Sequence, residues 1–223
     1  MLTKAHTLNS ARAFGNVSVR NSKMPGSAFA ISPSACKVGM KLAAVKGSVC
    51  SKCYAMKLEK MRPSVRHGWN ANLEKSVAAI ANNPMEWAEA IAHQINHYAL
   101  KSGVYYHRWF DAGDLQSVEM LAAIIMVVKL TSGVKHWLPT REAMIVRDYL
   151  QAYGAFPDNL VVRVSSTMVG DKPVSRAANT STVHKKGTPA HGHTCPASTQ
   201  GNACGDCRAC WNKAVDNVSY PLH

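Results

Sequence analysis

The sequence predicts an α/β fold, in which a parallel sheet is followed by a cysteine-rich, loop-rich C-terminal segment. Between residues 104 and 165, short runs of β-branched and aromatic residues alternate with longer runs that have apolar residues at helical spacing. One helix between successive strands is typical of a parallel sheet with right-handed crossovers. Beyond Thr167 this pattern fades, and four of the seven cysteines follow residue 190.

The elements are expected in a simple order along the chain. The expected strands cover residues 27–31, 104–110, 134–138 and 160–165. The expected helices cover residues 66–81, 84–101, 117–130 and 142–153. Asn83 and Pro84 suit an N-cap and a first helical turn, and Gly103, Gly133 and Gly154 end three of the helices.

The length of 223 residues fits one domain with appended segments. We expect residues 1–26 to form a basic, flexible arm that adds little to the core, and residues 27–167 to form the α/β core. Residues 168–223 are expected to be a cysteine-rich, metal-binding tail packed on that core.

Charge and cysteine usage limit the partners and the compartment. The formal net charge of +13 would attract polyanions, so nucleic acid is a candidate partner, although the basic residues look scattered and no RNA- or DNA-binding signature accompanies them. No secretory segment is visible, and the longest apolar run, residues 120–128, is too short to span a membrane. An odd number of cysteines without an export signal predicts a reducing compartment, so we expect a cytoplasmic protein without membrane contact. The sequence does not predict the oligomeric state.

The cysteines form two groups, and both predict metal binding. The second group contains Cys195, Cys204, Cys207 and Cys210, and its C-x2-C-x2-C spacing is difficult to satisfy with disulfides. Such a run is found in iron–sulfur proteins, whereas zinc sites more often use two separate C-x2-C pairs.

The first group contains Cys36, Cys50 and Cys53. Three thiolates on a [4Fe-4S] cluster leave one iron open to another ligand. Two alternatives remain: Cys36 is a buried apolar residue while the other two join another site, or all seven cysteines serve one region.

Polar residues follow the strands at the end where ligands of parallel α/β folds normally bind. Asp111 and Asp114 suit either acid–base chemistry or structural hydrogen bonding at the strand end. Arg141 suits either an anionic ligand or a structural salt bridge.

His191 and His193 lie near enough to Cys195 in sequence to ligate metal, or are simply solvated. The residues expected to meet at this edge are Cys36, Asp111, Gly113, Asp114, Thr140, Arg141, Ser165, Ser166 and Thr167.

Several motifs resemble those of the bacteriophage "gene product 88" family, over most of residues 27–212. The matching stretches are Cys50-Ser51-Lys52-Cys53-Tyr54-Ala55, Asp111-Ala112-Gly113-Asp114, Cys195-Pro196 and Cys204-Gly205-Asp206-Cys207-Arg208-Ala209-Cys210-Trp211. This resemblance implies a viral origin and brings little biochemistry with it.

The layout more distantly resembles the radical S-adenosylmethionine superfamily. That resemblance implies a partial (β/α) barrel-like sheet, with three cluster cysteines in the loop after the first strand and a cofactor motif after the second, here Ala112-Gly113-Asp114. It places Tyr54, Gly113, Asp114, Thr140 and Arg141 as cofactor-binding residues. The chain departs from the superfamily in its C-x13-C-x2-C spacing, in Asp where Glu is usual, and in having four expected strands instead of six.

The expected function is therefore that of an iron–sulfur phage protein with a radical-S-adenosylmethionine-like fold. It would carry one or two [4Fe-4S] clusters and would perform redox or radical chemistry if it binds S-adenosylmethionine; no catalytic residue is assigned. The alternative is a zinc-stabilised nucleic-acid-binding protein without catalysis.

Overall fold

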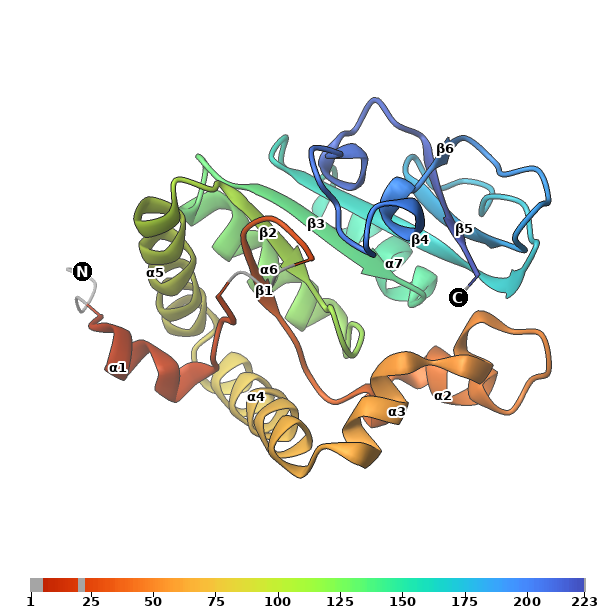
Figure 1. Ribbon diagram of the computed structural model, residues 1–223. Coiled ribbons are helices and arrows are strands. Elements are labelled where there is room, and N and C mark those ends of the chain that lie inside the picture. Colours follow the sequence, from red (N-terminus) through yellow and green to blue (C-terminus); the bar gives the residue numbers. More distant parts are fainter. Residues whose placement is uncertain (1–5, 20–22, 223) are drawn as a thin grey trace.

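A single parallel sheet organises the protein, which we describe from a computed structural model covering residues 6–19 and 23–222 (Figure 1). The described residues form seven strands in the order β1-β2-β3-β4-β5-β7-β6, and every neighbouring pair is parallel. The predicted α/β class with a parallel sheet is confirmed. The strands are β1 (Ser27–Phe29), β2 (Tyr106–Trp109), β3 (Lys135–Thr140), β4 (Leu160–Val169), β5 (Thr180–His184), β6 (His193–Thr194) and β7 (Asn217–Pro221).

The helices begin and end close to the capping signals of the sequence. Asn83 accepts a hydrogen bond from the amide of Glu86 at the start of α5, and Gly103 ends that helix at φ 68°. Ser117 caps the start of the next helix in the same way through Met120. The helices are α1 (Leu8–Ala11), α2 (Lys37–Ala43), α3 (Tyr54–Met61), α4 (Pro63–Asn82), α5 (Pro84–Ser102), α6 (Val118–Leu130) and α7 (Ala143–Tyr153).

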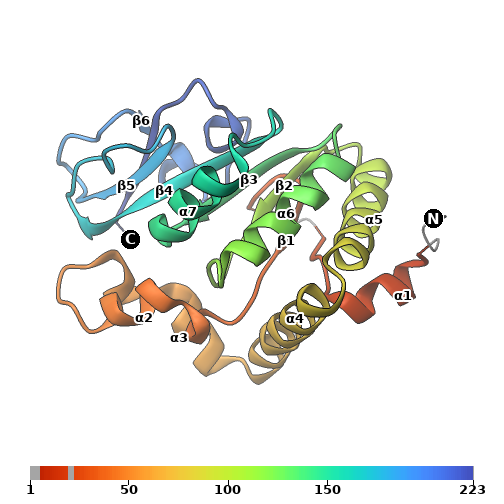
Figure 2. The ribbon, with the colours of Figure 1, turned by 180° about the vertical axis from the view of Figure 1, so that it is seen from behind.

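The two faces of the sheet are covered differently. Helices α5, α6 and α7 lie side by side on one face (Figure 2), where Phe29, Trp87 and Trp109 pack together in the main core. The C-terminal segment covers the other face of the sheet, where Trp137 of β3 packs against Trp211. This arrangement leaves the carboxyl ends of the central strands uncovered by these layers.

The N-terminal segment differs from the flexible arm that the sequence predicts. Residues 6–19 contain α1, and Ala11 and Val17 are 0% and 1% exposed. The buried side chain of Gln94 on α5 binds the carbonyl oxygens of Ala11 and Gly15 and the amide of Val17. Two small apolar side chains and the buried amide of Gln94 therefore hold this segment against α5. Because the segment has no long amphipathic pattern, its docking could not be predicted from the sequence. The rest of the predicted arm includes residues 1–5 and 20–22, which lie outside the described residues.

The sheet extends beyond the four predicted strands. Strand β4 continues to Val169, and β5, β6 and β7 add three further strands in a region expected to be irregular. Strand β5 escapes the prediction because it is polar but buried, with hydroxyl groups paired inside the sheet, such as Ser165 Oγ with Ser181 Oγ at 2.8 Å. Residues 185–216 are loop-rich, as predicted. No helix in the described ranges is long and apolar enough to cross a membrane.

Candidate functional site

A pocket of about 150 Å³ opens at the carboxyl ends of strands β1 to β4. All three cysteines of the first group and all five residues predicted to bind a cofactor line this pocket. Ser165 also lines it, whereas Ser166 binds the carbonyl oxygen of Lys172 instead. The predicted residues on the pocket wall are Cys36, Cys50, Cys53, Tyr54, Asp111, Gly113, Asp114, Thr140 and Arg141.

The three thiols share one electrostatic environment. Burial raises the pKa of the Cys36 thiol strongly, and the nearby acidic groups, Asp114 first and then Cys53 and Cys50, raise it further. A methyl group built at Gly39 would lie 3.7 Å from the Sγ atoms of both Cys36 and Cys50, so these sulfur atoms flank the same small space. Cys36 therefore lies beside Cys50, and whether the three cysteines share one metal site stays a prediction.

Hydrogen bonds tie the cysteine loop to the ends of the strands. Glu142, which follows β3, accepts a hydrogen bond at 2.8 Å from the amide of Val38 on α2. Lys37 Nζ binds the carbonyl oxygen of Gln116 at 2.6 Å. At the far side of the loop, the amide of Val169 on β4 donates to the carbonyl oxygen of Gly47 at 3.1 Å. The loop is therefore held at three points around the pocket.

Asp114 joins the ends of β2 and β3. Its carboxylate accepts hydrogen bonds from Thr140 Oγ1 at 2.5 Å, from the amide of Arg141 at 2.9 Å and from the amide of Leu115 at 2.8 Å. Burial raises its pKa to about 6, even though all three hydrogen bonds lower it. The geometry thus gives Asp114 and Thr140 a structural role, and their binding of a cofactor stays a prediction.

Gly113 has a steric reason to be glycine. Its φ is +85°, and a Cβ atom there would lie 2.4 Å from Ile31 Cγ1 and 2.7 Å from the carbonyl oxygen of Ile31. The amide of Ile31 donates to the carbonyl oxygen of Ala112 at 3.1 Å. The Gly113 position therefore lets the chain after β1 pass directly against the chain after β2.

Two guanidinium groups face the pocket with unused hydrogen-bonding capacity. Arg108 and Arg141 both line it, and the buried Nε atom of each lacks a hydrogen-bond partner within the described part of the chain. Arg108 also stacks on Trp137, with its Cζ atom 4.6 Å from the ring centroid. Tyr54 closes the rim by donating to the carbonyl oxygen of Asp111 at 2.5 Å. Sequence reasoning missed Arg108, whose only signal was its place within a strand-like run.

The second cysteine group lies on the opposite side of the sheet from α5, α6 and α7. Cys207 Sγ is 3.5 Å from His193 Nε2, and Cys210 Sγ is 3.2 Å from the hydroxyl of Tyr220. Burial raises the pKa of Cys210 to about 12. Burial raises the pKa of Cys204, and the negative charges of Cys195 and Cys207 raise it further.

Arg163 holds this second segment in place. The residue is 0% exposed, and its guanidinium group donates five hydrogen bonds to main-chain carbonyl groups. Burial lowers its pKa. A lone Arg within the apolar run of β4 is the sequence signal for this role, and sequence reasoning missed it. The acceptor residues are Ala209, Cys210, Asn212, Thr180 and Asp216.

Neither group forms a ready metal-ligand set. Within residues 6–19 and 23–222, no three His, Cys, Asp or Glu side chains are arranged as a metal-binding group. The donor chemistry of each group nevertheless suits iron or zinc, since thiolates are the preferred ligands of both. His193 is close to a cysteine thiol of the second group, whereas His191 contacts the sheet through its carbonyl oxygen, which accepts from Asn217.

Comparison with known proteins identifies the family of this chain but no individual relative. The family model described as "Gene product 88" matches residues 2–213. Neither the curated proteins nor the solved structures contain a match. The chain therefore belongs to the gene product 88 family.

Proposed function

We propose that this phage-family protein binds an iron–sulfur cluster through Cys36, Cys50 and Cys53. One observation carries the proposal: the three cysteines and the adjacent Tyr54 line the same pocket as four residues from the ends of β2 and β3. In this arrangement three thiolates would hold the cluster and leave one iron open to a small ligand.

S-adenosylmethionine is the small ligand that the distant superfamily resemblance suggests. A reduced cluster would supply the electron for the cleavage of S-adenosylmethionine. The protein's own residues would orient the bound molecule and exclude water. Arg141 offers a cation for a carboxylate, and Tyr54 covers the rim.

We propose a different role for the second group of cysteines. Four thiols would provide all the protein ligands of a second cluster, with no open position. Arg163 fixes the main chain at Ala209 and Cys210, and Trp211 covers the segment by donating to the carbonyl oxygen of His107 at 2.9 Å. Such a site is suited to structure or electron transfer.

The test is anaerobic purification followed by iron, sulfide and zinc analysis. We expect iron and sulfide in the wild-type protein. A triple variant, with Cys36, Cys50 and Cys53 changed to Ser, should lose the first cluster only. The matched variant, with Cys195, Cys204 and Cys207 changed to Ser, should retain it.

A colourless protein that contains only zinc would overturn the proposal in favour of the zinc-stabilised alternative. The S-adenosylmethionine role has its own measurement, the formation of 5′-deoxyadenosine after reduction with dithionite. Iron without this product would leave a cluster that serves structure or electron transfer.

A further inference from the structure

The segment that carries the first cysteines is strongly basic, and we name residues 37–66 the basic flap. It contains eight Lys and Arg residues and one acid, Glu59, so 8 − 1 = +7 of the formal charge of +13 lies in these thirty residues. Glu59 is buried and accepts hydrogen bonds from Ser32 and Ser34, so it does not neutralise the surface. The cations are Lys37, Lys41, Lys46, Lys52, Lys57, Lys60, Arg62 and Arg66.

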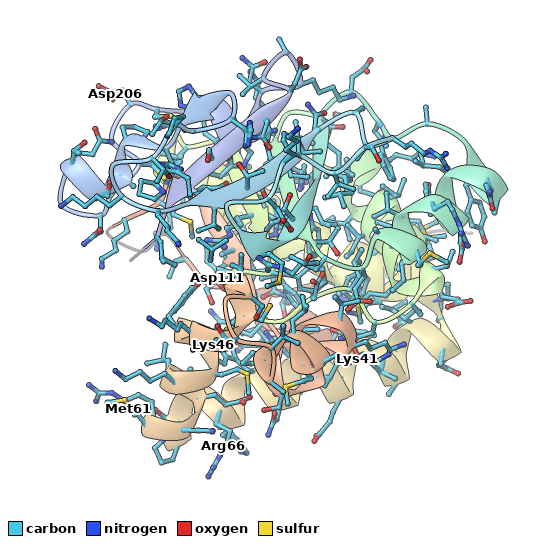
Figure 3. All side chains as sticks on the ribbon, turned by 90° about the vertical axis from the view of Figure 1, so that its right-hand side faces the viewer. Lys41, Lys46, Met61, Arg66, Asp111 and Asp206 are labelled. Carbon is cyan, nitrogen blue, oxygen red and sulfur yellow. The ribbon has the colours of Figure 1, made fainter. Side chains whose placement is uncertain are left out.

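These cations are exposed and take part in none of the ion pairs within the described residues. All eight are exposed, and Figure 3 shows Lys41, Lys46 and Arg66 on the flap, below Asp111. The ion pairs of the described ranges join Arg147 to Asp148 and Lys213 to Asp158, outside the flap. The basic residues are therefore concentrated, although the sequence suggested that they are scattered.

The flap also forms one wall of the pocket. Cys36 precedes it, and Gly39, Cys50, Cys53 and Met56 within it line the cavity. The contacts of Val38 with Glu142 and of Gly47 with Val169 hold its position relative to the strand ends. None of the eight cations lines the cavity itself, so a polyanion would lie at the mouth of the pocket if it binds the side of the flap that carries these lining residues.

Two features favour nucleic acid over other polyanions. Tyr54 is 63% exposed at the rim and offers an aromatic surface on which a base could stack. Arg108 and Arg141 continue the positive charge into the cavity. A nucleic acid strand has both phosphates and planar bases, so it could use the cations of the flap together with the exposed ring of Tyr54.

We propose that the basic flap binds single-stranded nucleic acid and places one nucleotide at the pocket lined by the three cysteines. Single strands are favoured because a base within a duplex cannot reach a pocket without being unstacked. Binding of nucleic acid by the basic flap does not depend on the proposed iron–sulfur cluster. Only a reaction of the bound nucleotide would rest on the proposed function.

The test measures binding of a fluorescent 20-nucleotide single-stranded DNA by anisotropy at several salt concentrations. In the flap variant, Lys41→Glu with Lys46→Glu, we expect affinity to fall at least tenfold. The slope of log K against log salt should fall by roughly 0.7 for each phosphate that the variant no longer neutralises. The control, Lys101→Glu with Lys129→Glu, makes the same change in net charge at exposed positions where α5 and α6 end, at the opposite edge of the sheet from the pocket, and should weaken binding less than threefold.

A third variant, Tyr54→Ala, should weaken binding without changing the salt slope, because it removes stacking and no charge. Circular dichroism and thermal melting would verify that each variant is folded. Equal weakening in the flap and control variants would overturn the proposal, since net charge alone would then explain binding.

Two other results would also overturn the proposal. Inorganic polyphosphate binding as tightly as the DNA would show a surface for polyanions in general. Flap-dependent binding to phosphatidylserine vesicles without binding to DNA would show a membrane-facing surface. Iron analysis of the same preparations separates this inference from the proposed function: DNA binding without iron contradicts only the function, and iron without DNA binding contradicts only the inference.

Discussion

The two cysteine groups are held by opposite kinds of structure. The first lies in a loop between β1 and α4 that contacts the strand ends at a few points and borders an open pocket. The second lies between β5 and β7 and is fixed from beneath by the buried side chain of Arg163. Exposure separates only Cys210, which is buried beside Tyr220, from the other six cysteines, which are half-buried in both groups. Reactivity is therefore expected at the first group and rigidity at the second.

The largest effect should come from Arg163→Met. This change removes all five hydrogen bonds of the buried guanidinium group, although the carbonyl oxygens of Ala209, Asn212 and Asp216 each keep another donor. The free energy of unfolding should fall by about 3–5 kcal/mol. Urea denaturation of the metal-free protein would measure it. Arg147→Met is the matched control, because Arg147 makes only an exposed pair with Asp148, and should cost less than about 1 kcal/mol. If both variants lowered the free energy of unfolding equally, Arg163 would not fix the second cysteine segment, and the proposed difference in rigidity between the two groups would be wrong.

Asp114→Asn should give a pH-dependent effect in the first group. Burial raises the pKa of Asp114 from 3.8 to about 6, so between these values the unfolded chain ionises more readily than the folded one. The stabilising contribution is therefore fully present below pH 3.8 and is lost as the pH rises through about 6. Relative to Asp114→Asn, the wild-type free energy of unfolding should fall by up to about 3 kcal/mol between about pH 4 and about pH 7.

Urea denaturation of both proteins across this range would measure the difference. His107 and His136, whose pKa values burial lowers, destabilise both proteins in acid, and their contribution cancels in the comparison. A difference that is constant with pH would show that Asp114 titrates normally.

The smallest effect should come from Glu142→Gln, which keeps an oxygen for the amide of Val38 but removes the charge. We expect α2 to loosen locally by about 1 kcal/mol, measured by amide hydrogen exchange. The pKa of Cys36 should also fall, since the negative charge of Glu142 contributes to raising it, and alkylation of Cys36 in the metal-free protein should become faster. Exchange in residues 204–211 serves as the internal control, and loosening there as well would contradict a local role.

The sequence predicted the central part of the fold because hydrophobic periodicity decides it. Strands β2, β3 and β4 and helices α5, α6 and α7 are mostly apolar on the faces that they bury, with His107, His136 and Arg163 as buried exceptions in the strands. Clear caps mark the starts of α5 and α6. The pocket followed from topology alone, because the carboxyl ends of neighbouring parallel strands must meet.

The remainder depends on buried polar groups, which leave no periodic signal. Strand β5 is built from Thr and Ser whose hydroxyl groups are paired inside the sheet. The docking of residues 6–19 depends on Gln94, and the second cysteine segment depends on Arg163. Such contacts join residues far apart in the sequence, so they emerge only when the chain is folded.

The strand order has a consequence for how the pocket is assembled. Strands β2 to β5 pair in chain order across short connections, whereas β1 must find β2 across residues 30–105, which contain the basic flap. Closing a long loop costs more conformational entropy than closing a short one, and distant contacts form more slowly. We therefore expect β2, β3 and β4 to pair before β1 docks, so that three walls of the pocket exist before the thiols arrive. The cysteine loop would then be the last part of the site to close, while its sulfur atoms are still accessible to an incoming metal.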